Sequence, residues 1–447
     1  MSFPRYPKYK ESGVEWLGQV PEHWEVLALK RIVSIPITDG PHETPQFIDE
    51  GIPFVSAEAV SSGRIDFSKV RACISVEDNA RYSLKYSPKL HDIFMVKSGA
   101  TTGITAIVEG RTDFNIWSPL AVIRCGKDAV PHFVLSFMRS RNFLEGVTLN
   151  WSFGTQQNIG MGVIENLFCT QPPLPEQAAI ADFLERETAK IDELISEQQQ
   201  LIELLKEKRQ AVISHAVTKG LNPDAPMKPS GIEWLGDVPK HWEVKRLKHI
   251  SPFITVGVVV NPSSFVADEG LPFIYGGDIR EGIIDWANSR RIDERSGEAN
   301  SKTKLNAGDL LTVRVGAPGV TAVVPKECQD GNCASVMLIR QGEFNSQWLC
   351  YAMNTRVVRF QVEVVQYGAA QEQFNIAHAV NFWTPLPPRA EQEEITSFLD
   401  TETAKFDTLT SEAQKAIDLL QERRTALISA AVTGQIDVRK AANIKCP

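Results

Sequence analysis

The sequence has no long apolar run and few cysteines, and both absences restrict what it can be. Its 447 residues include no apolar run near the roughly 18 residues needed to cross a bilayer, so no membrane segment is predicted. The opening residues, 1–8, have no signal-peptide core, which predicts a cytoplasmic protein. The seven cysteines form an odd, scattered set that favours reduced thiols. Cys328 and Cys333 lie close together, but without a CxxC or HxxxH pattern they predict no zinc site.

The motifs of common catalytic sites are also missing. The sequence has no GxxxxGK[ST] phosphate loop, no HExxH zinc pair and no GxSxG nucleophile elbow. It lacks the Asn-Pro-Pro-aromatic run that would mark an adenine methyltransferase, and residues 261–264 are the nearest approach. A strand rather than a helix is predicted after the glycine-rich residues 99–103, which excludes a dinucleotide fingerprint. We therefore predict a non-catalytic chain with no catalytic residue, metal or cofactor of its own.

The chain does contain an internal sequence repeat of two copies. Residues 12–26 recur as residues 230–244, and both copies carry Trp-Leu-Gly-x-Val-Pro-x-His-Trp. We interpret His23 and His241 in this motif as packing or capping residues, with catalysis or metal binding as the alternative. Later segments repeat more loosely in the same order, as short strands with Gly and Pro turns and a few helices. This pattern predicts a tandem duplication of a mixed α+β domain of about 150 residues.

The duplication sets the predicted boundaries. Each copy of the α+β domain is followed by a long helix, and a proline-rich linker joins the first helix to the second copy. The predicted segments are a first domain at 1–174, a first long helix at 175–218, a linker at 219–229, a second domain at 230–386, a second long helix at 387–434 and a C-terminal tail at 435–447.

The two long helices share a heptad pattern. Each follows a Pro-Leu-Pro signal, and apolar residues at this period, with charges outside the stripe, are typical of a coiled-coil seam. Each helix can find its partner in the other copy, which predicts an antiparallel coiled coil that acts as a spacer; two core helices of one compact domain are the alternative. The predicted seam residues are Leu184, Ile191, Leu194, Leu201, Leu205, Val212, Leu399, Phe406, Leu409, Leu420 and Leu427.

The acidic charge is concentrated on these helices. The chain has a formal net charge of -8, while residues 176–203 carry -6 and residues 388–418 carry -5, so the rest of the chain is mildly basic at +3. The globular domains therefore remain compatible with a nucleic-acid partner.

Two polar loops in each copy are candidates for contacting nucleic acid. The glycine-rich loop is predicted to form a tight hairpin or to bring its backbone close to a phosphate or base. The glutamine-rich loop before each long helix offers carboxamides, which pair with adenine as Arg pairs with guanine, with capping of the turn as the alternative. Other Lys and Arg residues are candidate phosphate contacts or solvated charges. The candidate DNA-binding residues are Lys85, Lys89, Lys97, Ser98, Thr101, Thr102, Gln156, Gln157, Asn158, Arg290, Arg291, Lys302, Lys304, Arg314, Gln371, Gln373 and Asn375.

These features together resemble a known family. The doubled Pro-Leu-Pro entries with Glu176-Gln177 and Glu391-Gln392, the long helices, the Gln-x-Asn-Ile-like loops and the Trp-Leu-Gly-x-Val-Pro-x-His-Trp openings are similar to those of the specificity subunit of a Type I restriction-modification system. The resemblance covers nearly the whole chain, and the doubled order is more specific than any single motif. It implies two target-recognition domains that each read one half of a bipartite double-stranded DNA site.

The resemblance also implies partners. The antiparallel coiled coil would dock two methylation subunits, which bring S-adenosylmethionine and methylate adenine. Restriction subunits, expected as a pair, would bring ATP and Mg for translocation and cleavage. The departures between the two glutamine loops weaken exact symmetry between the copies, not the family assignment.

Two other functions remain open from the residues alone. One is a coiled-coil scaffold whose globular domains bind protein or carbohydrate, which an unchanged partner list and intact restriction after scrambling both glutamine loops would favour. The other is a self-sufficient DNA-modifying enzyme, which methyl transfer by the purified chain alone would favour.

Overall fold

The computed structural model describes residues 3–153, 157–365 and 373–439. The chain divides into two compact units: unit 1 comprises residues 1–199 and 415–447, and unit 2 comprises residues 200–414. The long helices are α6 (Leu174–Lys219) and α11 (Arg389–Val432). Unit 1 contains the start of α6 and the end of α11, and unit 2 contains the remainder of both helices. Among the described residues, no helix is both long and apolar enough to span a bilayer.

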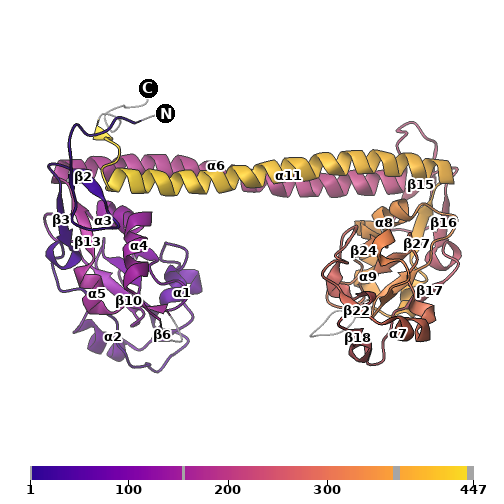
Figure 1. The fold of residues 1–447 in the computed structure, drawn as a ribbon, viewed down its shortest axis with the longest axis horizontal. Helices are drawn as coiled ribbons and strands as arrows, with labels where there is room; N and C mark the ends of the chain where they lie inside the picture. The colour runs from indigo at the N-terminus through magenta and orange to yellow at the C-terminus, as the bar shows by residue number, and fades with distance from the viewer. Residues whose placement is uncertain (1–2, 154–156, 366–372, 440–447) are drawn as a thin grey trace. The chain divides into compact units, whose positions relative to one another are not determined.

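Unit 1 is built around a four-stranded antiparallel sheet in the order β4-β10-β7-β8. The sheet is buried on both faces, because Ile93 and Met95 of β7 join one core while Phe94 and Val96 join another. Figure 1 shows α3 and α4 between this sheet and α6, where they share the first core with the long helices. The strands are β1 (Tyr9–Glu11), β2 (Gln19–Pro21), β3 (Glu25–Ala28), β4 (Thr38–Asp39), β5 (Ile52–Val55), β6 (Cys73–Ile74), β7 (Ile93–Val96), β8 (Thr105–Ile107), β9 (Asn115–Ile116), β10 (Leu120–Ile123), β11 (Ser152–Phe153), β12 (Gln157–Asn158) and β13 (Phe168–Gln171). The short helices are α1 (Ala57–Val60), α2 (Val76–Ser83), α3 (Pro131–Met138), α4 (Arg141–Asn150) and α5 (Met161–Asn166).

Unit 2 repeats this plan with a sheet in the order β17-β26-β23-β24. Its two faces are again buried in separate cores, with Leu310 in one and Leu311 in the other. The shared strand order confirms the predicted tandem duplication of an α+β domain. The strands are β14 (Met227–Pro229), β15 (Asp237–Pro239), β16 (Glu243–Arg246), β17 (Ile254–Val256), β18 (Val266–Ala267), β19 (Leu271–Ile274), β20 (Ile279–Arg280), β21 (Ile283–Ile284), β22 (Arg290–Ile292), β23 (Leu310–Thr312), β24 (Thr321–Val323), β25 (Asn332–Cys333), β26 (Met337–Ile339) and β27 (Trp383–Leu386). The short helices are α7 (Glu294–Ala299), α8 (Ser346–Asn354), α9 (Arg356–Val365) and α10 (Ile376–Ala379).

The long helices pack against each other through repeat-related contacts in both units. In unit 1, Arg424 Nε lies 3.0 Å from Asp192 Oδ1. In unit 2, Arg209 Nε lies 3.6 Å from Asp407 Oδ1, and these residues hold the corresponding places in the repeat. The start of α6 shares a core with the end of α11 in unit 1, and the end of α6 shares a core with the start of α11 in unit 2. The predicted antiparallel pairing is therefore confirmed.

The predicted seam is right in its period and wrong at three positions. Leu194, Leu201 and Leu409 are 43%, 42% and 47% exposed and lie outside the seam. On α6 the step after Ile191 is four residues rather than three, so the half-buried Ile195 and the buried Ile202 take the places of Leu194 and Leu201. The remaining predicted residues are buried at Leu184, Ile191, Leu205, Leu399 and Phe406 and half-buried at Val212, Leu420 and Leu427.

The tryptophan motif anchors the start of each long helix. Glu176, in the first turn of α6, accepts hydrogen bonds from Trp24 Nε1 (3.1 Å) and from the Tyr6 hydroxyl, and His23 Nε2 lies 2.9 Å from it. In unit 2 the corresponding indole and imidazole lie 3.0 and 2.8 Å from Glu391. An acid is favourable at a helix N-terminus, where the backbone N–H groups point outward. The motif histidines thus contact the helix start, in line with the packing interpretation.

Candidate nucleic-acid interface

The glycine-rich loop of unit 1 is a tight hairpin that joins β7 to β8. Gly103 N donates to Val96 O (2.8 Å), and the φ of Gly103 is +95°, a conformation that favours glycine. A side chain added at Gly103 would also meet Leu144 of α4 at 3.1 Å. Of the two interpretations of this loop, the hairpin is the one that the structure shows. The candidate residues on this hairpin are Lys97, Ser98, Thr101 and Thr102.

The glutamine loop of unit 1 lies directly against this hairpin. Gly99 N donates to Gln157 O (2.9 Å), and Ile159 N donates to Lys97 O (2.9 Å). Ser98 and Asn158 form an antiparallel bridge between these two bonds. The side chains of Gln157 and Asn158 are exposed. Two candidate loops that are about 55 residues apart in the sequence therefore form one polar surface.

Unit 2 brings the corresponding loops together in the same way. Phe374 N donates to Arg314 O (3.3 Å), and Arg314 Nε donates to Phe374 O (3.2 Å). Val315 and Gln373 form the antiparallel bridge. The guanidinium of Arg314 is thus held at the junction of the two loops.

This pairing corrects the correspondence between the two glutamine loops. The buried Ile159 and the buried Phe374 make the same bond to the hairpin, so Asn158 corresponds to Gln373 rather than to Asn375. Asn375 instead caps α10, because its Oδ1 accepts from the backbone N of the second helical residue (3.0 Å). For Asn375, capping is what the structure shows. Gln156 and Gln371 lie outside the described residues.

A buried carboxylate organises the cations beside the unit 1 hairpin. Asp39, at the end of β4, is 4% exposed and lies 2.7 Å from Lys97 Nζ, 2.6 Å from Lys85 Nζ and 3.0 Å from His42 Nε2. Burial alone would raise the pKa of the Asp39 carboxyl, but hydrogen bonds and charges from Lys85 and Lys97 outweigh it and hold that pKa below its ordinary value. Two candidate cations are therefore fixed in place by one acid.

Unit 2 has no acid at the corresponding place. Asp39 pairs with Ala121 of β10, and Val256 pairs with the corresponding residue of β26, so Val256 occupies the position of Asp39. Lys97 is replaced by Arg314 at the matching hairpin position. The two surfaces thus share a backbone frame and differ in the polar groups that they present.

The remaining candidate cations are not on the hairpins. Lys89 is exposed in the turn before β7. Arg290 stacks 4.2 Å above the ring of Tyr275, and Arg291 donates to Ala287 O (3.3 Å), both from the separate sheet β18-β22-β19-β25. Lys302 is exposed, and Lys304 lies 2.6 Å from Glu298, which neutralises it. These residues therefore belong to the surrounding surface of each unit rather than to the loop junction.

Two polar residues of the unit 1 site were not predicted from the sequence. Asp39 and His42 lie in the segment Thr38-Asp39-Gly40-Pro41-His42, which reads as a simple turn. The available signal was an acid directly before a glycine. Among the described residues, no group of three or more His, Cys, Asp and Glu side chains could hold a metal ion.

A family model described as the Type I restriction modification DNA specificity domain matches residues 21–204. This range runs from the end of β2 through the unit 1 hairpin and glutamine loop into α6, and unit 2 repeats the same fold. Over these residues the chain is similar to the Type I restriction-modification DNA specificity family. Its curated relatives include the type I restriction enzyme EcoBI specificity subunit of Escherichia coli, 25% identical over 66% of this chain and 64% of that protein. They also include the MjaVIII specificity subunit of Methanocaldococcus jannaschii, 22% identical over 96% of this chain and 97% of that protein.

Solved structures share the fold of this chain. A chain from a type I R-M system studied for complex assembly and conformational transition superposes with a TM-score of 0.69, at 18% identity over 93% of this chain and 99% of its own. The HsdS subunit from Thermoanaerobacter tengcongensis superposes with a TM-score of 0.53, at 19% identity over 93% and 98% of the two chains. The tandem architecture of the fold is therefore shared with these two solved structures.

Proposed function

We propose that this chain is the non-catalytic subunit that selects the DNA site of a Type I restriction-modification complex. The observation that carries the proposal is the loop junction: in each unit, backbone pairing fixes a hairpin and a glutamine loop as one polar surface. Fixed amide and cationic side chains suit the reading of base edges and phosphates. The similarity of residues 21–204 to a DNA specificity domain supports nucleic acid as the partner.

The two units would read different half-sites. The junction of unit 1 presents Gln157 and Asn158 beside the Asp39-bound Lys97, whereas that of unit 2 presents Gln373 beside Arg314. Arg recognises guanine and carboxamides recognise adenine most readily, so the two surfaces favour different bases. A bipartite target with unlike halves follows. The exposed cations Lys89 and Lys302 would add phosphate contacts.

The partners follow from the same proposal. The exposed acidic faces of α6 and α11 would dock two methylation subunits, which would supply S-adenosylmethionine and methylate adenine. A pair of restriction subunits would supply ATP and Mg. The predicted target-recognition domains at 1–174 and 230–386 would then choose the site without taking part in the chemistry.

The test is a map of methylated adenines in cells that express this chain with its methylation subunits. The wild-type chain should give one split motif. A Gln157→Ala, Asn158→Ala variant should relax one half only, because each lost base contact weakens discrimination by about 1–3 kcal/mol. Gln373→Ala should relax the other half.

The matched control is Gln19→Ala, since Gln19 is an exposed amide of unit 1 that bonds Glu11 (2.7 Å) away from the junction. It should leave the motif unchanged. Methylation that is independent of the chain, or a loop variant that alters both halves together, would contradict the proposal.

A further inference from the structure

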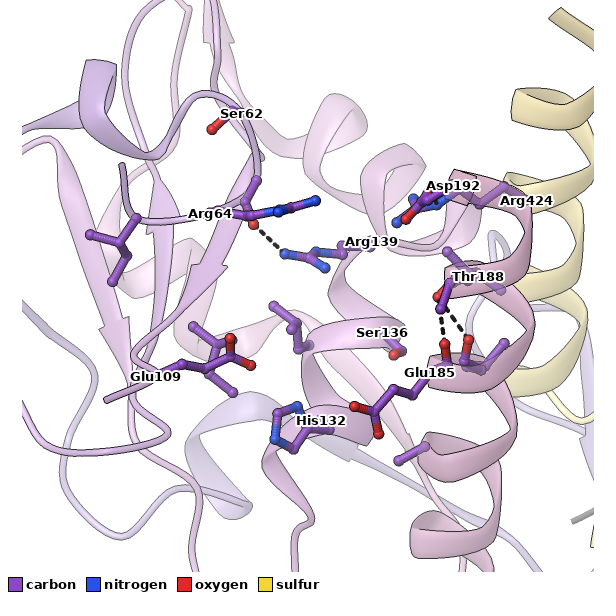
Figure 2. A pocket seen from close by; sticks show the side chains of 18 of the residues that line it. Ser62, Arg64, Glu109, His132, Ser136, Arg139, Glu185, Thr188, Asp192 and Arg424 are labelled. Atoms are coloured by element: carbon purple, nitrogen blue, oxygen red, sulfur yellow. Dashed lines mark hydrogen bonds and ion pairs between the residues drawn. The ribbon is translucent and has the colours of Figure 1, made fainter. Parts of the chain in front are cut away.

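Unit 1 contains a cavity of about 940 Å³ beside the long helices (Figure 2). Its walls come from the loop after α1, from α3, and from both α6 and α11. The volume is within the usual range of small-molecule sites, about 300–1,000 Å³. Three arginines reach it: Arg64 from the loop, Arg139 from the end of α3 and Arg424 from α11.

The arginine end of the cavity is held in place. Arg139 Nη2 donates to Gly63 O (2.6 Å) and to Thr105 O (3.1 Å), and Figure 2 shows Arg64 and Arg139 pointing toward each other. Burial, together with the charges of Arg424 and Arg64, lowers the pKa of Arg139 to about 10. These guanidinium groups therefore repel one another in a partly desolvated place.

Three acids, Glu109, Glu185 and Asp192, also line the cavity, so acids and arginines are equal in number. Asp192 lies 3.0 Å from Arg424, and Glu109 also attracts Arg139. Figure 2 places Glu109 and Glu185 with His132 at the opposite end of the cavity from Arg64. The charge is thus separated, with the cationic end next to α11.

Unit 2 has a carboxylate at the position that corresponds to the arginine end of the cavity. Gly63 and Gly282 correspond in the repeat and share positive φ values of 78° and 73°, so the residue before each occupies the same place. That residue is Ser62 in unit 1 and Glu281 in unit 2. The Glu281 carboxylate lies 2.5 Å from Arg359 and 3.9 Å from Arg209, which is the counterpart of Arg424.

Three further exchanges accompany this one. Arg64 corresponds to Ile283 and Arg139 to Asn354, and both Arg139 and Asn354 bond the carbonyl of the repeat-related threonine. Tyr351 of unit 2, whose hydroxyl donates to Asp400 (2.7 Å), is replaced by the smaller Ser136. Unit 1 has thus lost a carboxylate, a tyrosine and the arginine that pairs with Glu281, because Leu144 stands in place of Arg359. It has gained two arginines, so both space and positive charge remain.

We propose that the unit 1 cavity binds a small molecule carrying an oxyanion, phosphate or carboxylate, in the place of the Glu281 carboxylate. The oxyanion would bridge Arg64 and Arg139 of the globular domain to Arg424 of the long helix, as Glu281 bridges Arg359 to Arg209 in unit 2. Guanidinium groups present paired N–H donors that match both anions. The bound molecule would thereby fasten the unit 1 domain to the long helices.

Calorimetric titration of the full-length chain tests this, with inorganic pyrophosphate and citrate as separate probes. We expect one bound anion per chain, and the tighter probe distinguishes phosphate from carboxylate chemistry. Arg64→Ala should weaken binding about tenfold, the equivalent of one charged hydrogen bond. Ser62→Glu should abolish binding, because it supplies the internal carboxylate that unit 2 already has.

The matched control is Ser397→Glu, which adds the same charge at an exposed position of α11 in unit 2 and should leave binding unchanged. Circular dichroism melts confirm that each variant is folded, and Ser62 and Arg64 are both exposed, which favours folding. Failure of both anions to bind the wild type, or equal binding by wild type and Ser62→Glu, overturns the proposal. The methylation motif is a separate readout, so either result leaves the site-selection proposal standing.

Discussion

Replacing Glu176 by alanine should destabilise the junction between the unit 1 domain and α6 more than the matching change does in unit 2. Glu176 accepts from two buried donors, Trp24 Nε1 and the Tyr6 hydroxyl, which are 0% and 4% exposed. An orphaned buried donor costs about 1–3 kcal/mol, so the loss at Glu176 is about 2–6 kcal/mol. Glu391 serves one indole, and its side chain is 23% exposed against 7% for Glu176, which predicts a loss of about 1–3 kcal/mol.

Hydrogen exchange followed by mass spectrometry measures this unit by unit. Glu176→Ala should deprotect peptides that contain residues 19–28 and the start of α6, and Glu391→Ala should deprotect residues 237–246 to a smaller degree. Glu22→Ala is the control, because the Glu22 side chain forms a surface ion pair with Lys8 (3.8 Å), a class of contact worth about 0–1 kcal/mol. An effect of Glu176→Ala no larger than that of Glu22→Ala, or equal effects at Glu176 and Glu391, would refute the reasoning.

Three other expectations rest on single side chains. Asp92 is fully buried and holds Arg124 at 2.7 Å, so Asp92→Ala should cost about 3–5 kcal/mol in urea unfolding, and a loss below 1 kcal/mol would contradict the buried pair. Leu184→Ala should cost about 2–5 kcal/mol, whereas Leu194→Ala should cost less than about 1 kcal/mol, and the reverse order would place the seam elsewhere. Because the folded pKa of Asp39 is lowered, its contribution is complete above the unfolded pKa of about 4 and is lost as pH falls through the folded pKa. Asp39→Asn should therefore flatten the acid limb of the stability profile, and an unchanged limb would show that the Lys85 and Lys97 contacts do not stabilise the fold.

The sequence predicted the heptad period of the long helices, but it did not predict which face of each helix packs in the seam. Both residues that follow Ile191 at the candidate steps are apolar, Leu194 at three and Ile195 at four. A single helix does not distinguish these two faces, since both lie within one broad apolar stripe. The partner helix decides, and it covers Ile195 and Ile202 while Leu194 and Leu201 stay exposed.

Charged residues inside the seam were unpredictable for a related reason. Arg209 and Arg424 hold half-buried positions on the paired helices. Each forms an ion pair with an acid on the other long helix, Asp407 or Asp192, more than 190 residues away along the chain. Local sequence marks such residues as surface charges, because the partner is brought in only by the antiparallel pairing.

Aligning the two copies in the sequence located the glutamine loops but did not give their residue-by-residue correspondence. Repetition correctly placed a polar loop before each long helix, but the shared Gln-x-Asn-Ile-like pattern, which would align Asn158 with Asn375, gives the wrong register. The structure fixes the register through the buried Ile159 and Phe374, because an apolar side chain under the hairpin is a stronger constraint than an exposed amide. The contact between the glutamine loop and the glycine-rich hairpin could not be predicted from the sequence either, because it depends on which backbone segment β12 pairs with.

The side-chain differences between the two copies are therefore most informative about function at positions where the backbone hydrogen bonds are the same. The backbone bonds that join hairpin and glutamine loop recur in both units, while Asp39 gives way to Val256 and Lys97 to Arg314. A packing role alone would allow an ion pair to be replaced by apolar residues at both positions, but an arginine is retained at the second. Unit 2 therefore keeps a cation at the loop junction, but it lacks the acid that restrains Lys97 in unit 1. The two surfaces thus differ in the polar groups that they present and share the backbone frame that presents them, which is the pattern expected of paired readers with separate targets.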